Sequence, residues 1–206
     1  MKNILLNNKL VLLVLLVFTF SCKKGPCINL DELDELAKET KEWYTDENIE
    51  NQNITDQNGV SQTLKVFRTS SNEYDISYSD DCGNDYGSFS FSIQYQTSIS
   101  PFNFDIDVRG DGNPNDGFYL KLSVNDNNSS SNYRSTTYDF KTKNTRESNA
   151  TVEILNQYII NSTTYNDVME ITFNSTNSNE IKTVFYAKQF GIIKFIKGNG
   201  NEFQLD

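Results

Sequence analysis

Apolar and polar residues alternate in short runs over most of the chain, and this alternation constrains the fold more than any other feature. In the clearest run, 89–95, Phe89, Phe91, Ile93 and Tyr95 alternate with polar residues. A two-residue period places successive side chains on opposite faces of a strand, so each run predicts a half-buried strand. The predicted strands are 62–68, 74–78, 89–95, 102–108, 118–124, 133–141, 152–160, 167–173, 181–188, 191–197 and 202–205.

Turn-forming residues separate these runs. Asn58-Gly59 is a strong turn signal, and residues 198–201, Gly-Asn-Gly-Asn, predict a hairpin turn before the last strand. The run 133–141 is weaker than the others and predicts an exposed strand. Many short strands joined by turns predict a mainly β fold, in the form of an antiparallel meander, a sandwich or a partly open barrel.

Residues 29–45 have a helical rather than a two-residue period. Apolar residues recur at helical spacing from Leu30 to Tyr44, and Asp31 and Glu32 lie in the first turn, where acidic groups suit the helix dipole. The pattern predicts one N-terminal α-helix packed on the sheet. A helix that binds a partner through this apolar stripe is the alternative.

The first 21 residues have the pattern of a signal peptide. A basic start is followed by an apolar segment, 10–20, which is too short to span a bilayer. Ser21-Cys22 then looks like a lipobox, and its looser form is similar to that of Bacteroidota lipoproteins. We therefore expect a lipid on Cys22, a short tether over 22–28 and a single β-rich domain over 29–206. An ordinary secretory leader is the alternative.

The two remaining cysteines, Cys27 and Cys82, predict one disulfide, because an even pair in an oxidising compartment is usually joined. Two buried or unpaired thiols are the alternative.

The composition excludes several classes of function. The chain has no histidine, which removes Ser-His and Cys-His catalysis and His-metal sites. Its formal net charge of −10 disfavours nucleic acid and anionic lipid as partners. No recognisable nucleophile motif is present. We therefore expect a protein that is not an enzyme and needs no cofactor.

The segment 105–117 is rich in Asp, Asn and Gly and contains a weak candidate metal site. Asp111, Asn113 and Asn115 place oxygen ligands at every second residue, as calcium loops do. The spacing departs from an EF-hand, because Gly117 follows one position too late and Leu122 replaces the closing glutamate. A hairpin turn between two strands is the alternative interpretation.

Three stretches together resemble a family of small, uncharacterised Bacteroidota lipoproteins. They are Ser21-Cys22-Lys23-Lys24, residues 39–44 with Asn58-Gly59 downstream, and residues 184–195 with the end at 203–205. The resemblance implies an outer-membrane lipoprotein of the cell envelope. Lys23 and Lys24 stand where surface-displayed members often have acidic residues, which favours the periplasmic face.

These observations lead to several hypotheses about function. We expect a membrane-anchored envelope lipoprotein that is a non-catalytic binding module for a protein or an envelope polymer. One alternative is a small-ligand or lipid-binding lipoprotein with an apolar cavity between sheet and helix. A further alternative is an immunity or inhibitor protein against a secreted toxin, whose basic surface an acidic chain would attract. A hydrolase is the least favoured.

Overall fold

The computed structural model describes residues 30–44, 48–79, 85–97, 102–110, 117–126, 133–147 and 149–206, and only the backbone of residues 30, 69–79 and 85–87. Within these residues the elements are α2 (Leu30–Lys41), β1 (Asn51–Asp56), β2 (Ser61–Ser79), β3 (Asp85–Thr97), β4 (Phe102–Gly110), β5 (Phe118–Asp126), β6 (Tyr133–Asp139), β7 (Asn144–Thr145), β8 (Ala150–Ile160), β9 (Thr163–Phe173), β10 (Ile181–Ala187), β11 (Gly191–Lys197) and β12 (Glu202–Leu205).

All twelve described strands belong to one antiparallel sheet. Its strand order is β7-β6-β5-β4-β3-β2-β1-β12-β11-β10-β9-β8, so every neighbouring pair but one is consecutive in the chain. The exception is the seam between β1 and β12, where Ile54 pairs with Leu205 and Asp56 with Phe203. The sheet is a nearly closed, barrel-like meander with one helix packed against it. The mainly β class and the packed helix predicted from the sequence are therefore confirmed.

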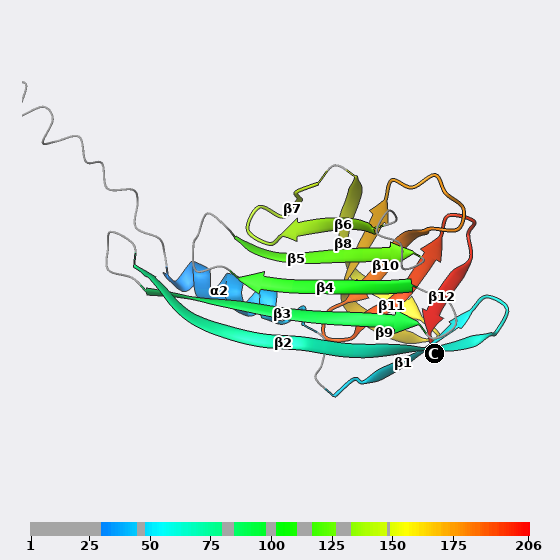
Figure 1. The fold of residues 1–206 in the computed structure, drawn as a ribbon, viewed down its shortest axis with the longest axis horizontal. Helices are drawn as coiled ribbons and strands as arrows, with labels where there is room; N and C mark the ends of the chain where they lie inside the picture. The colour runs from blue at the N-terminus through cyan, green and yellow to red at the C-terminus, as the bar shows by residue number, and fades with distance from the viewer. Residues whose placement is uncertain are drawn as a thin grey trace, which may run out of the picture.

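The sheet has two halves that face each other. Figure 1 shows the long strands β2–β5 in front, with α2 behind one part of them and the strands β8–β11 behind the other. Aromatic rings join the halves: Phe104 of β4 lies 5.3 Å from Phe195 of β11, and Phe102 lies 5.8 Å from the same ring. We call β2–β6 the front half and β8–β12 the back half.

The end of α2 is fixed to the back half. The Tyr186 hydroxyl donates a 2.7 Å hydrogen bond to the Trp43 carbonyl, and the two rings stack 6.4 Å apart. Phe140 lies 6.0 Å from Trp43 on the other side. Leu33 and Trp43 are buried in the same core as the front strands, so the apolar stripe of the helix packs on the sheet as predicted. No helix in the described part of the chain combines the length and the apolar character that a membrane crossing needs.

Glycine is required at the end of β4 for a steric reason. A Cβ atom on Gly110 would lie 2.2 Å from the Phe89 ring and 2.8 Å from the Phe118 ring. The two rings, 6.3 Å apart, close over this backbone position. Residue 110 therefore belongs to the inner packing of the sheet and not to a ligand loop.

Three details of the predicted strands were wrong. The runs 62–68 and 74–78 belong to one continuous strand, β2, because both pair with β3. The run 133–141 predicted an exposed strand, but Thr136, Thr137, Tyr138 and Asp139 of β6 are buried. Tyr138 of this strand packs in the inner core, with its ring 5.3 Å from the Phe140 ring, and Thr137 donates hydrogen bonds from its backbone N–H and its hydroxyl to the Glu147 carboxylate. The strands β1 and β7 carry no clear alternation and were not predicted.

Candidate binding surface

The outer face of the front half is polar. Cross-strand hydrogen bonds join its side chains: Gln94 donates to Asp105 over 2.8 Å, and the Tyr133 hydroxyl donates to Ser123 over 2.7 Å. Arg146 pairs with Asp139 at 2.8 Å beside them. These groups satisfy one another next to water, so this face has the character of an ordinary solvated sheet surface.

The outer face of the back half is apolar instead. Along β10, Val184 and Tyr186 belong to the inner core, whereas the alternate residues Phe185 and Ala187 belong to a second cluster. Successive side chains of a strand point to opposite faces, so this second cluster lies outside the sheet. We call it the outer cluster, and its buried members are Ile160, Tyr165, Val168, Phe185, Ala187 and Ile193.

A partly exposed rim surrounds the outer cluster. Leu155, Tyr158, Ile196 and Leu205 pack against it while remaining partly accessible. Phe190, in the turn between β10 and β11, is 45% exposed, and its ring meets the Tyr165 ring edge-on at 5.3 Å. Apolar residues with aromatic rings at an accessible rim are the composition typical of protein interfaces.

Lys194 crosses the rim from β11. Its Nζ lies 2.6 Å from the Glu202 carboxylate and 5.8 Å from the centre of the Phe185 ring. Burial tends to lower the pKa of Lys194, but hydrogen bonding with Glu202 and Tyr158 outweighs this and raises it. Lys194 therefore keeps its positive charge over the apolar cluster.

The alternation of inner and outer side chains in β9 changes at one residue. Asp167 of β9 has a left-handed φ of 51°, which is unusual for a non-glycine residue. The burial pattern of β9 changes at this point, since Tyr165 and Val168 are both buried although three positions separate them. The change at Asp167 therefore places Tyr165 in the outer cluster together with Val168.

An ion-pair cluster lies on the inner side, between the two halves. Arg134 of β6 pairs with Asp126 of β5 and donates a 2.7 Å hydrogen bond to the Ile181 carbonyl of β10. The Ile181 N–H donates to Asp126 over 3.2 Å. Arg134 also lies 3.6 Å from Glu180 and over the Phe173 ring. These contacts link the front half to the back half, so we interpret the cluster as structural.

Burial raises the pKa of the Asp126 carboxyl above its ordinary value, although the charge of Arg134 and the hydrogen bond from Ile181 oppose the rise. Raised carboxyl pKa values also occur in active sites. Here the carboxyl faces protein groups that already bind it, and the pair lies in the core rather than in a cleft.

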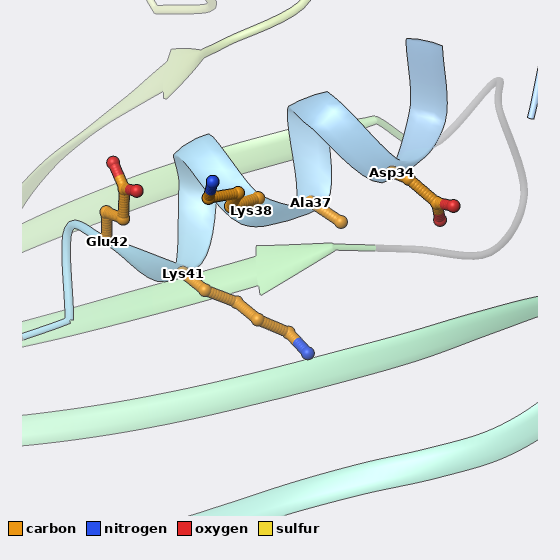
Figure 2. Close-up of a pocket in the computed structure, with 5 residues that line it drawn as sticks. All are labelled: Asp34, Ala37, Lys38, Lys41 and Glu42. Atoms are coloured by element: carbon orange, nitrogen blue, oxygen red, sulfur yellow. The ribbon is translucent and has the colours of Figure 1, made fainter. Parts of the chain in front are cut away.

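A hollow of about 540 Å³ runs along α2. It is lined by Asp34, Ala37, Lys38, Lys41 and Glu42. Figure 2 shows Asp34 and Lys41 extending from the same side of the helix, whereas Glu42 points to the other side. Lys41 lies 5.0 Å from the centre of the Phe89 ring, and Glu42 is bound to Lys188 at 2.6 Å. The hollow is open, and we assign it no ligand.

The predicted site residues lie outside the described part of the chain. This applies to the lipidation site Cys22, to the predicted disulfide Cys27–Cys82 and to the calcium candidates Asp111, Asn113 and Asn115. Lipidation, the disulfide and the calcium site therefore stay predictions. Among the described residues, no three His, Cys, Asp or Glu side chains form a group that could hold a metal ion.

Sequence reasoning did not find the outer cluster, although a signal was present. Residues 184–187 read Val-Phe-Tyr-Ala, and residues 192–196 read Ile-Ile-Lys-Phe-Ile, so apolar residues occupy consecutive positions instead of alternate ones. Near-continuous apolar runs are typical of strands buried on both faces.

No protein-family model, curated protein or solved structure matches the chain.

Proposed function

We propose that the chain is a membrane-anchored envelope lipoprotein that acts as a non-catalytic binding module for another protein. The observation that carries the proposal is the outer cluster with its accessible rim. The six members of the outer cluster are themselves buried, so the surface offered to a partner is the rim, where Phe190 is 45% exposed. An apolar, partly aromatic surface is where a protein partner gains most from excluding water.

The inner packing supports a protein partner over a small ligand held inside the sheet. The space between the two halves is occupied by buried side chains from both, and Phe195 stacks on Phe203 at 4.6 Å within it. Trp43, which is 2% exposed, fills the region beside α2. A ligand in this position would have to displace well-packed rings, each of which contributes several kcal/mol to stability.

The location remains part of the proposal. The leader pattern supports a lipid on Cys22 and anchoring to the outer membrane, with the domain on the periplasmic face. Labelling cells with a radioactive fatty acid tests the anchor: the chain becomes labelled, and the Cys22→Ala variant does not. Equal labelling of both chains would contradict lipidation at this residue.

Site-specific photo-cross-linking in the native envelope tests the binding surface. A photoreactive amino acid at Phe190 or Ile196 is expected to trap one defined protein, because both positions lie at the rim of the outer cluster. The same amino acid at Val60, which is 52% exposed in the turn between β1 and β2, is the matched control and is expected to trap none. Equal products from all three positions, or none from Phe190 and Ile196, would reject the surface.

A charge placed on the rim gives a second readout. Phe190→Asp is expected to reduce capture of the trapped partner at least tenfold, because a carboxylate cannot be desolvated against an apolar surface without a large cost. Val60→Asp is expected to leave capture unchanged. Circular dichroism of both variants should match the native protein, since both side chains are exposed.

A further inference from the structure

The end of the hairpin formed by β8 and β9 leaves the plane of the sheet. The register of β9 with β10 stops at Val168 opposite Ala187, and beyond that point no described strand other than β8 pairs with β9. Asn161, in the turn of the hairpin, donates a 3.3 Å hydrogen bond to the Leu205 carbonyl and accepts one of 3.3 Å from the Gln204 amide. These two residues belong to β12, which lies three places from β9 in the sheet, or about 14 Å at the usual strand spacing. The turn therefore reaches them by lying across β10 and β11.

The hairpin end covers the outer cluster. The Tyr158 ring lies 4.6 Å from the Phe185 ring of β10, and the Tyr165 ring lies 5.3 Å from that of Phe190. Ile160, between them in the chain, is 4% exposed. The alternate residues of the hairpin end point away from the cluster and are exposed, namely Gln157, Ile159, Thr164 and Asn166. We call residues 156–166 the flap.

Two features of the backbone mark a hinge at the base of the flap. Asp167 has the left-handed φ of 51°. Residues 156 and 167 are also the one step of the β8–β9 ladder at which no pair forms. A sparsely populated backbone conformation persists where surrounding contacts impose it, and such residues are common in switch regions. Lifting the flap would release Asp167 from this conformation, whereas the flap's own ladder, from Gln157 opposite Asn166 to Ile160 opposite Thr163, would stay intact.

We propose that the flap is a displaceable cover of the outer cluster, which opens at Asp167 and lets the protein partner take its place. The inference rests on the proposed function, because a partner gains most from excluding water when it reaches the buried residues as well as the rim. Opening uncovers a floor that is formed by Phe185, Ala187 and Ile193.

The flap itself shows which kind of partner fits this floor. Tyr158 and Ile160 present an aromatic and a β-branched side chain to it from alternate positions of one extended strand. Partners that bind as extended segments use the same alternation to fill neighbouring pockets. The partner is therefore expected to supply an extended segment with aromatic and β-branched side chains at alternate positions.

The contacts that hold the flap can be exchanged. The two hydrogen bonds of Asn161 are exposed, so water replaces them when the flap lifts. The remaining contacts are apolar, and a partner with apolar side chains restores them. The inner core and its strand ladders are not involved in this exchange. Opening of the flap should therefore need less free energy than unfolding of the whole chain.

Thiol labelling of two buried positions tests whether the flap opens. Ile193→Cys places a thiol under the flap, and Ile106→Cys is the matched control in the inner core, since both isoleucines are 0% exposed. A buried thiol reacts with a maleimide only when the structure around it opens. In the full chain in nonionic detergent, we expect labelling at position 193 to be about tenfold faster or more than at position 106. Mass spectrometry of the peptides measures each site separately from the native cysteines.

The urea dependence of labelling separates local opening from global unfolding. Labelling at position 193 should change little at low urea, whereas labelling at position 106 should rise steeply, because unfolding exposes far more surface than opening of the flap. Urea unfolding of the two variants shows whether they differ in overall stability. Equal rates, or the same urea dependence at both positions, would overturn the proposal.

A covalent link tests whether the partner needs the flap to open. Asn161→Cys with Gln204→Cys places two thiols where the flap meets β12, and a short bismaleimide joins them. We expect the link to reduce capture of the protein trapped at Phe190 about tenfold or more, because the floor stays covered. Undiminished capture would show that the partner binds the rim of a closed flap, and it would overturn the displacement.

The matched control for the link lies on the front half. Gln94 and Asp105 are also joined by a side-chain hydrogen bond, of 2.8 Å, and they pair across β3 and β4. Linking Gln94→Cys with Asp105→Cys is expected to leave capture unchanged, as is treatment of the native chain with the same reagent. An equal loss of capture in the control would remove the support of the flap link for the proposal.

The flap and the proposed function fail separately. If Phe190 and Ile196 trap no protein, the binding surface is rejected together with the partner's role here, and the labelling rates still decide whether the flap opens. If labelling shows a flap that stays closed while Phe190 traps a partner, the binding function stands and the displaceable flap is overturned.

Discussion

The two halves of the sheet both direct apolar side chains into the inner core, but their outer faces differ. In the front half, the strands alternate between inner apolar and outer polar residues, and the outer groups bond to one another. In the back half, β10 and β11 are apolar on both faces, and the outer cluster forms a second core against the solvent. The outer face of one part of a sheet can therefore be an ordinary solvated surface while that of another part is a candidate interface. The difference lies in the outward-facing positions, which are every second residue of each strand.

The largest expected effect tests whether the outer cluster is a real core. Phe104→Ala on the inner face is expected to lower the free energy of unfolding by about 3–5 kcal/mol, and Phe185→Ala in the outer cluster by about 3 kcal/mol. Phe67→Ala, at the 44% exposed outer position of β2, is the control and should cost about 1 kcal/mol or less. Urea denaturation measures all three. A cost for Phe185 as small as that for Phe67 would end the distinction between the halves.

The second prediction concerns the ion pair that links the halves. Arg134→Leu leaves Asp126, whose side chain is 1% exposed, without its cationic partner. Removing one partner of a buried pair costs about 3 kcal/mol or more. Arg146→Leu removes an ion pair from the outer face, where the arginine is 40% exposed, and should cost about 1 kcal/mol or less. Equal losses of unfolding free energy would show that the inner pair does not fasten the halves together.

The third prediction uses pH to compare an inner and an outer carboxyl. Burial raises the pKa of Asp126, so the folded chain holds this proton more tightly than the unfolded chain, whose value is 3.8. The stability that Asp126 contributes is therefore fully present below pH 3.8, and it is lost as the pH rises through the pKa of the folded chain. For Asp139, burial is outweighed by hydrogen bonds from Thr142 and Arg146, and the pKa is lowered. Its contribution is present above 3.8 and is lost as the pH falls through the folded pKa.

Chemical denaturation of Asp126→Asn and Asp139→Asn against pH measures these signs. The stability difference between the native chain and Asp126→Asn should fall as the pH rises from about 4 toward neutrality. The difference for Asp139→Asn should rise with pH below about 4 and then stay constant. A rising difference for Asp126 would mean that the attraction of Arg134 exceeds the effect of burial.

The smallest effect belongs to the polar outer face. Asp105→Ala removes the acceptor of the Gln94 hydrogen bond, but water replaces it on a solvated surface. The free energy of unfolding should change by about 0.5 kcal/mol. Capture of the partner trapped at Phe190 should not change either. A loss of capture with Asp105→Ala would place the binding surface on the front half.

Much of the fold was predictable because the signals are local. The two-residue period of the apolar side chains at 89–95 predicts β3, and the helical spacing of the leucines predicts α2. The turn at Gly59 was predictable for the same reason: its φ of 80° suits glycine, and Asp56 accepts hydrogen bonds from the backbone of Asn58 and Val60. Each signal depends on residues within a few positions of one another.

The candidate surface was not predictable in this way. Phe185 and Tyr186 are neighbours in the chain, yet one belongs to the outer cluster and the other to the inner core, and the period alone cannot assign the faces. The seam between β1 and β12, where Ile54 pairs with Leu205, joins segments far apart in the sequence.

The sequence by itself therefore determined the strands, the helix and the antiparallel class, because backbone period and turn chemistry act over short distances. Only the tertiary structure decided which face of each strand is covered, that β1 and β12 close the meander into a barrel-like sheet, and that the end of the β8–β9 hairpin lies over the outer cluster. The physical reason is that burial depends on what packs against a side chain, and those neighbours can lie far away in the chain, as Tyr186 and Trp43 illustrate.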